Sequence, residues 1–187
     1  MLAPLVTALA LAAGPGSQAL VSSRDSLGVL NGLAVVVDVD DPAHVAASDP
    51  RALASRIEGA LRAKGIHVYQ HAGNRPAKSA GTPGTEGQLK LEVVAIQGTT
   101  GPGAQAVLRY DVGISQWVRL EADDASTAFA RTWTQGGVLA APAAGAPALL
   151  RQAVDEAVEQ LCRDYASARA FWLARQRAAS AEQAESP

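Results

Sequence analysis

The longest alternating segment of the sequence, residues 104–121, constrains most strongly how this chain can fold. One parity is mainly apolar: Ala106, Leu108, Tyr110, Val112, Ile114, Gln116, Val118 and Leu120. A period of two with one apolar face predicts a strand that covers a core on one side. At about 3.3 Å per residue, the strand would be on the order of 50 Å long, so we expect it to bend, at Gly113.

The size and charge of the chain limit its organisation and its partners. With 187 residues, it is long enough for one ordinary core and short for two, so we expect a single domain. The formal net charge of −2 comes from 16 basic and 18 acidic residues. This balance provides no basic surface for nucleic acid, so we predict no nucleic-acid partner.

Residues 1–19 resemble a secretory signal peptide. An apolar run at residues 2–13 is followed by the helix-breaking Gly14-Pro15-Gly16 and by small residues suited to cleavage. The alternative is that this segment forms an N-terminal helix of the fold. The run is too short to span a bilayer by itself. We therefore expect a periplasmic or secreted protein that begins at Leu20 and has no transmembrane span.

A β-α-β unit is predicted to open the domain, after a lead-in at residues 20–31. Residues 32–40 alternate as a mostly buried strand. Asp49 and Pro50 favour a helix start, because Asp accepts from free amides and Pro suits the first helical position. This helix is expected over residues 50–64, and a second strand, parallel to the first, over residues 66–70.

Three further strands are predicted to form an antiparallel meander. They are expected at residues 88–97, 104–121 and 127–134, and Gly136 and Gly137 are expected to end the last one. The sequence thus predicts an α+β fold, with a five-stranded mixed sheet and two helices packed on one face.

The second of these helices is predicted from Pro147 to about Arg175. Its apolar side chains recur at spacings of three and four, at Leu150, Val154, Val158, Leu161, Tyr165, Ala168 and Trp172. Beyond Arg175 no apolar face accompanies the helix formers. We therefore expect a single α+β domain at residues 32–175 and a frayed or disordered tail at residues 176–187.

The residues that could carry chemistry do not form a recognisable motif. His44, His67 and His71 have no spacing that joins a general base to a nucleophile. Cys162 is the only cysteine, so it is either a free thiol or paired with another chain. Asp38, Asp40 and Asp41 crowd a strand end but lack the pattern of a calcium loop. We predict no catalytic residue, cofactor or metal.

One set of residues on the meander has the composition of a binding surface. Arginine and aromatic side chains are the types that protein interfaces favour, and the candidates are Arg109, Trp117, Arg119, Arg131 and Trp133. The alternative is that the final helix packs over this face and buries both tryptophans in the core. Strand register decides between them, and the sequence does not specify it.

Several short segments together resemble a group of uncharacterised exported bacterial proteins. These segments are residues 61–68, the strand with Leu89, Leu91 and Val93, residues 110–112, 118–120 and 132–137, and the pair Asp164-Tyr165. The resemblance covers roughly residues 30–168. It implies export and the same order of strands and helices, and it implies no activity and no role for any residue.

Two functional hypotheses follow from these observations. The first is a non-enzymatic exported protein that binds another cell-envelope component, or assembles with itself, through a sheet face or edge. The second is a small-molecule-binding or hydrolytic enzyme with a site near the Gly- and Pro-rich loop at residues 71–87.

Overall fold

The computed structural model describes residues 25–41, 48–69, 86–98, 103–120 and 123–185. The predicted signal peptide and most of the loop at residues 71–87 lie outside these ranges. The elements, in chain order, are a short 3-10 helix η1 (Asp25–Val29), β1 (Gly32–Asp40), α1 (Pro50–Ala63), β2 (Val68–Tyr69), β3 (Glu86–Gly98), β4 (Gln105–Leu120), β5 (Asp123–Pro142) and α2 (Ala146–Glu185).

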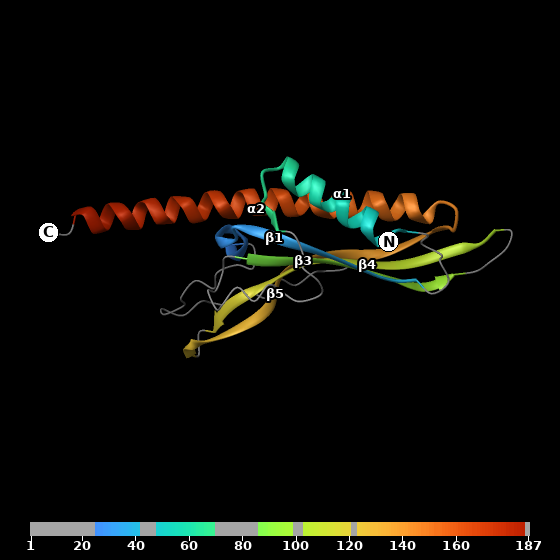
Figure 1. Ribbon diagram of the computed structural model, residues 1–187, viewed down its shortest axis with the longest axis horizontal. Coiled ribbons are helices and arrows are strands. Elements are labelled where there is room, and N and C mark those ends of the chain that lie inside the picture. Colours follow the sequence, from blue (N-terminus) through green and yellow to red (C-terminus); the bar gives the residue numbers. More distant parts are fainter. Residues whose placement is uncertain (1–24, 42–47, 70–85, 99–102, 121–122, 186–187) are drawn as a thin grey trace, which may run out of the picture.

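The five strands form one mixed sheet in the order β2-β1-β3-β4-β5. β1 is parallel to both β2 and β3, whereas β3, β4 and β5 are successively antiparallel. Both long helices lie on the same side of this sheet (Figure 1). The predicted α+β fold, with its β-α-β unit, its meander and its two helices on one face, is confirmed.

α1 forms where its local signals place it. The Asp49 carboxylate accepts a hydrogen bond from the Arg51 amide at 2.9 Å, and Pro50 occupies the first turn. The helix buries Leu53, Ile57 and Leu61, one residue per turn. Each such side chain contributes about 1.5–3 kcal/mol when removed from water, so this stripe fixes α1 on the sheet.

The core lies between the helices and the apolar parity of β4. Ala106, Leu108, Val112 and Ile114 are all buried beneath the helices, as the alternation predicts. The buried face of α2 supplies Leu150, Val154, Ala157, Val158 and Leu161.

β5 is longer than the sequence indicates, and the expected end at Gly136 and Gly137 is wrong. The strand continues to Pro142 and pairs with β4 along that length. A Cβ on Gly136 would lie 2.5 Å from the carbonyl oxygen of Tyr110. Gly136 therefore allows the backbones of β4 and β5 to approach each other closely, and it does not mark a turn.

η1 belongs to the core, although the sequence suggests only a lead-in before residue 32. Leu27 and Leu30 are completely buried, and the Tyr165 hydroxyl donates to the Leu30 carbonyl at 2.9 Å. Gly28 lies so close to α2 that a Cβ there would be 2.3 Å from the carbonyl oxygen of Ala168. Among the described residues, η1 is therefore packed against α2.

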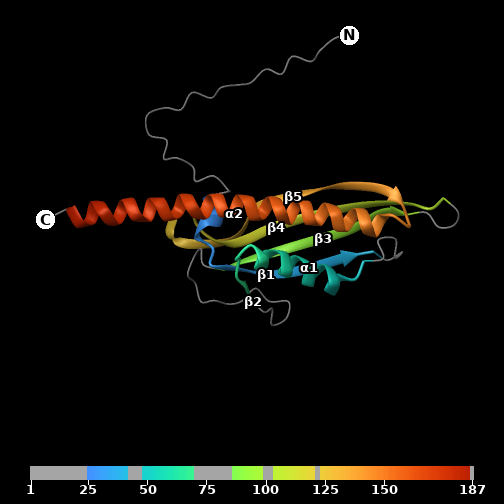
Figure 2. The ribbon, with the colours of Figure 1, turned by 90° about the horizontal axis from the view of Figure 1, so that it is seen from above.

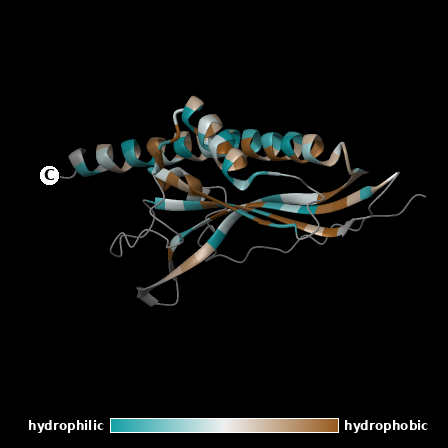
Figure 3. Ribbon diagram, turned by 45° about the vertical axis from the view of Figure 1, so that its right-hand side comes forward, coloured by the Kyte–Doolittle hydropathy of each residue, from teal (hydrophilic) through white to brown (hydrophobic). Residues whose placement is uncertain are grey.

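α2 has 40 residues, so it is about 60 Å long and extends past the sheet at its C-terminal end (Figures 1 and 2). Among the α2 residues whose burial is described, Ala168 is the last buried one. We call residues 169–185 the overhang. Its final turns are hydrophilic or neutral, and the apolar colouring of α2 lies over the sheet (Figure 3). The helix continues beyond Arg175, and fraying of the tail in solution stays a prediction.

Candidate interaction surface

The sheet has one face that neither long helix covers, and we call it the open face (Figure 1). It carries the polar parity of β4, which comprises Val107, Arg109, Asp111, Gly113, Ser115 and Trp117. In the described parts of the chain, this face presents a charged centre between two apolar ends.

The charged centre joins three strands. Arg131 of β5 donates to Asp111 of β4 at 2.7 Å, and its guanidinium lies 3.7 Å from Glu92 of β3. Glu92 also accepts a hydrogen bond from Lys90. Gly113 leaves room for this arrangement, because a Cβ there would lie 2.8 Å from Nε of Arg131. Gly113 thus lets an arginine lie across the strand, and a bend at this residue stays a prediction.

The electrostatics of this centre follow from its geometry. The hydrogen bond from Lys90 and the charges of Lys90 and Arg131 hold the pKa of the Glu92 carboxyl below its ordinary value. The same hydrogen bond to Glu92 raises the pKa of Lys90. The two side chains are 33% and 39% exposed, so water screens the pair and its contribution to stability is at most about 1 kcal/mol.

An aromatic pair forms one end of the open face. Trp117 is opposite Phe129 in the register of β4 and β5, and their ring centroids are 5.5 Å apart at 59°. Trp117 is 36% exposed and Phe129 is 38% exposed. Two large aromatic side chains therefore meet on the surface, where a contact could bury them.

The other end of the open face is aliphatic. Val94, Arg109 and Val138 are aligned across β3, β4 and β5. Val138 is 63% exposed and Val94 is 38% exposed. Arg109 therefore has a valine on each side.

The five predicted contact residues are divided between the two faces. Arg109, Trp117 and Arg131 lie on the open face. Arg119 aligns with Thr127 in the ladder, and its side chain is outside the described part of the structure. Trp133 lies beneath α2, where it is 7% exposed.

A β-bulge separates Trp133 from Arg131, although the two residues have the same parity. Ile114 is opposite Trp133, but the next residue, Ser115, is opposite Arg131, so Thr132 is an extra residue in β5. The two tryptophans therefore lie on opposite faces of the sheet. Trp117 is on the surface, and Trp133 is in the core.

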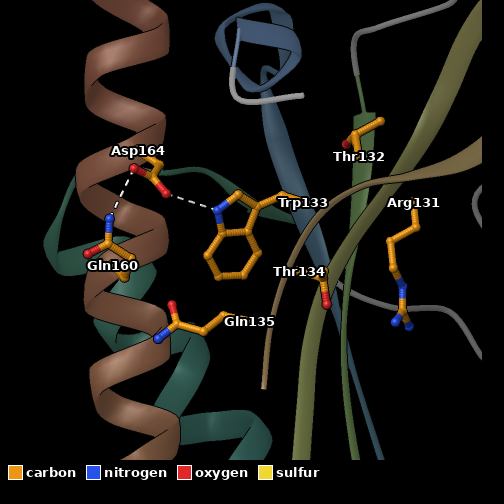
Figure 4. Close-up of a pocket in the computed structure, with 7 residues that line it drawn as sticks. All are labelled: Arg131, Thr132, Trp133, Thr134, Gln135, Gln160 and Asp164. Atoms are coloured by element: carbon orange, nitrogen blue, oxygen red, sulfur yellow. Dashed lines mark hydrogen bonds between the residues drawn. The ribbon is translucent and has the colours of Figure 1, made fainter. Parts of the chain in front are cut away.

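A pocket of about 430 Å³ lies between β5 and α2 around Trp133 (Figure 4). The Trp133 indole donates to one oxygen of the buried Asp164 carboxylate at 3.0 Å, and the Gln160 amide donates to the other at 3.0 Å. Arg131 points away from Asp164 (Figure 4). The carboxylate thus joins α2 to β5 and is held in place by two donors.

Comparisons with known proteins give similarities of fold at low identity. No protein-family model and no curated protein matches the chain. A dodecameric PelC variant from Paraburkholderia phytofirmans is 16% identical over 70% of this chain and 87% of its own, with a TM-score of 0.45. A minor lipoprotein from Acinetobacter baumannii is 12% identical over 74% of this chain and 93% of its own, with a TM-score of 0.38. At such low scores, no property of either protein is transferred.

The remaining candidates for chemistry are dispersed in the described regions. His67 is exposed, and its ring packs edge-on against that of Tyr69, with the ring centroids 4.6 Å apart. Cys162 is buried on α2, and burial raises the pKa of its thiol. No group of three potential metal ligands occurs among the residues described. None of the described helices is long and apolar enough to cross a membrane.

The sequence did not single out Phe129 or Asp111 as members of the surface. Phe129 has the alternation of a strand residue, but its pairing with Trp117 depends on the register after the bulge. Asp111 belongs to the polar parity that contains Arg109 and Trp117. This shared parity was the one sequence feature that could have placed Asp111 on the surface.

Proposed function

We propose that this chain is a non-enzymatic exported protein that binds another protein of the bacterial cell envelope through the open face of its sheet. The observation that carries the proposal is the exposed pair of Trp117 and Phe129 on a face that neither long helix covers. Tryptophan and arginine are the residues that most often dominate binding energy at protein interfaces.

The composition of the open face supports a specific contact. Of the six exposed large apolar residues in the described part of the chain, four lie on it, namely Val94, Trp117, Phe129 and Val138. Apolar groups of this size gain free energy when a partner removes them from water. The charged centre between the two ends would orient the partner, since charge complementarity sets register and orientation.

The outer edge of β5 provides a second route to the same function. β5 is the last strand of the sheet, and residues 132–142 contain no charged side chain. Charged residues on an edge strand protect it from pairing with other chains, and this segment lacks them. A strand of a partner, or of a second copy, could therefore extend the sheet here.

The predicted alternative, a ligand-binding or hydrolytic site near residues 71–87, stays a prediction. Residues 70–85 are outside the part of the chain that the structure describes.

A photocrosslinker tests the proposed surface directly. p-Benzoylphenylalanine replaces Phe129, and the same group at Ala60, an exposed position on α1, is the control. In the bacterial host, we expect a discrete crosslinked protein from position 129 that is absent from position 60. Mass spectrometry identifies the partner and distinguishes another protein from a second copy.

Two outcomes would contradict the proposal. One is a lack of any discrete product from position 129 in a folded, exported protein. The other is the same set of products from both positions, because that would reflect collisions at any exposed site. Trp117→Ala, which removes the neighbouring ring, should reduce the yield from position 129.

A further inference from the structure

We propose that the overhang of α2 docks on an anionic membrane surface. The overhang is the part of the helix that extends past the sheet (Figures 1 and 2). Its first turns combine apolar and basic side chains, and none of these residues belongs to the open face of the sheet.

A mainly apolar groove of about 380 Å³ lies where the overhang leaves the core. It is lined by Ser26 and Val29 from η1 and by Phe171, Trp172, Arg175, Gln176 and Ala179 from α2. Phe171 is 50% exposed. The groove thus offers aromatic surface and an arginine at a corner of the molecule.

The charge of this segment is one-sided. Within the overhang, residues 169–181 contain Arg169, Arg175 and Arg177 and no acidic residue, and Glu182 and Glu185 follow near its C-terminal end. The Arg175 guanidinium lies 5.8 Å from the ring centroid of Phe171, and that of Arg169 lies 4.7 Å from the ring centroid of Trp172. Helices that lie on membranes are rich in basic residues and in Trp, Phe and Leu.

A lipid surface fits the overhang better than a partner helix does. Beyond Leu173 the helix contains no apolar side chain larger than alanine. A helix that pairs with another copy needs an apolar residue in every turn along the seam. Here the apolar residues are confined to positions 171–173, and arginines follow them, which matches shallow contact with lipid headgroups.

The groove also lies beside the first described element of the chain. η1 is the first described element and forms one wall of the groove. The 24 residues before it include the apolar run at residues 2–13, which is predicted to be a secretory signal.

Vesicle binding tests this inference independently of the sheet surface. The chain is purified after export, its N-terminus is sequenced, and binding to phosphatidylcholine vesicles with or without phosphatidylglycerol is measured by flotation. We expect binding only with phosphatidylglycerol, weakening as salt rises. Arg175→Gln with Arg177→Gln should weaken it on the order of 25-fold, because each basic residue at an anionic surface contributes roughly fivefold.

The matched control is Arg51→Gln with Arg151→Gln, which removes the same charge from exposed positions near the starts of α1 and α2. Its binding should remain that of the parent. Equal losses in both double variants, or no binding by the parent at low salt, would overturn the inference. If Arg175→Gln with Arg177→Gln instead changes the oligomeric state of the protein in solution without lipid, a second copy and not lipid occupies the overhang.

A second measurement identifies the segment that touches lipid. Brominated acyl chains quench tryptophans at the membrane interface, and Trp172 and Trp117 are the two candidates. We expect Trp172→Phe to abolish the quenching and Trp117→Phe to preserve it. The reverse result would place the sheet face on the membrane and reject the overhang.

Discussion

At the scale of single residues, glycines show how backbone contact shapes this protein. Gly28, Gly113 and Gly136 each lie against atoms of a neighbouring element at distances that exclude a Cβ. The neighbour differs in each case: a helix carbonyl, an arginine side chain and a strand carbonyl. Only the arginine can move aside easily, because it is the flexible end of a side chain.

The first prediction concerns Gly28→Ala. The new methyl group would lie 2.3 Å from the Ala168 carbonyl oxygen, so η1 and α2 must separate. We expect a loss of about 2–3 kcal/mol in the free energy of unfolding, measured by urea denaturation. Gly59→Ala is the control. Gly59 is at an exposed position of α1, and no described atom of another element lies within 4 Å of where its Cβ would be, so we expect the free energy of unfolding to rise by about 0.5–1 kcal/mol. Similar effects at both positions would show that η1 does not pack on α2 in solution.

At the scale of elements, the open face is stabilised by side chains that cross from strand to strand. Lys90 and Glu92 lie two residues apart on the same face of β3, and Asp111 and Arg131 continue the contacts onto β4 and β5. Because these groups are partly exposed, their main effect is expected in the response to pH and salt.

The second prediction is therefore a dependence of stability on acid. The pKa of Glu92 is below its ordinary value of 4.5 in the folded chain, so its contribution is complete above that pH and is lost as pH falls through the lower folded value. Glu92→Gln should cost at most about 1 kcal/mol at pH 7, and the difference from the parent should vanish in acid. Urea titrations of both proteins at several pH values measure this difference in the free energy of unfolding.

Lys90→Gln provides the check on the cause of that effect. With the principal donor to Glu92 removed, the further change Glu92→Gln should have a smaller effect at pH 7. An undiminished effect would mean that Lys90 does not hold the carboxylate in its charged form.

α2 is the element in which packing changes most along the chain. Residues 150–168 contribute a buried stripe, whereas residues 174–181 are exposed throughout. A helix without tertiary contacts is only marginally stable in water.

The third prediction is a steep change in amide exchange along α2. Amides in residues 176–185 should exchange with solvent within seconds, and those in residues 150–168 should be protected close to the global stability. Hydrogen exchange with mass spectrometry measures both. Strong protection of the last turns in the free protein would contradict a frayed tail.

At the scale of the whole molecule, α2 unites the described parts of the fold. It contacts η1, α1, β4 and β5, and its Asp155 pairs with Arg56 of α1 at 2.6 Å. The sheet, in turn, joins the β-α-β unit to the meander through the parallel pairing of β1 and β3. These contacts leave no boundary at which the described core could divide.

The fourth prediction is therefore a single cooperative unfolding transition. Urea curves from far-ultraviolet circular dichroism and from tryptophan fluorescence should coincide, because Trp133 in the core and the backbone of both long helices lose structure together. Two separated transitions would show that the meander and the β-α-β unit unfold independently.

The sequence by itself determined the class of fold, because that information is local. The alternation of β4 indicated a strand with one apolar face, and Asp49-Pro50 marked the start of α1. The tertiary structure decided what depends on register and on close approach. The bulge at Thr132 put Trp133 under α2 and left Arg131 and Trp117 on the open face. Gly136 was expected to end a strand and Gly28 lies in the expected lead-in, but both are contacts between elements. The sequence does not show this, because it does not say which atoms lie beside a glycine.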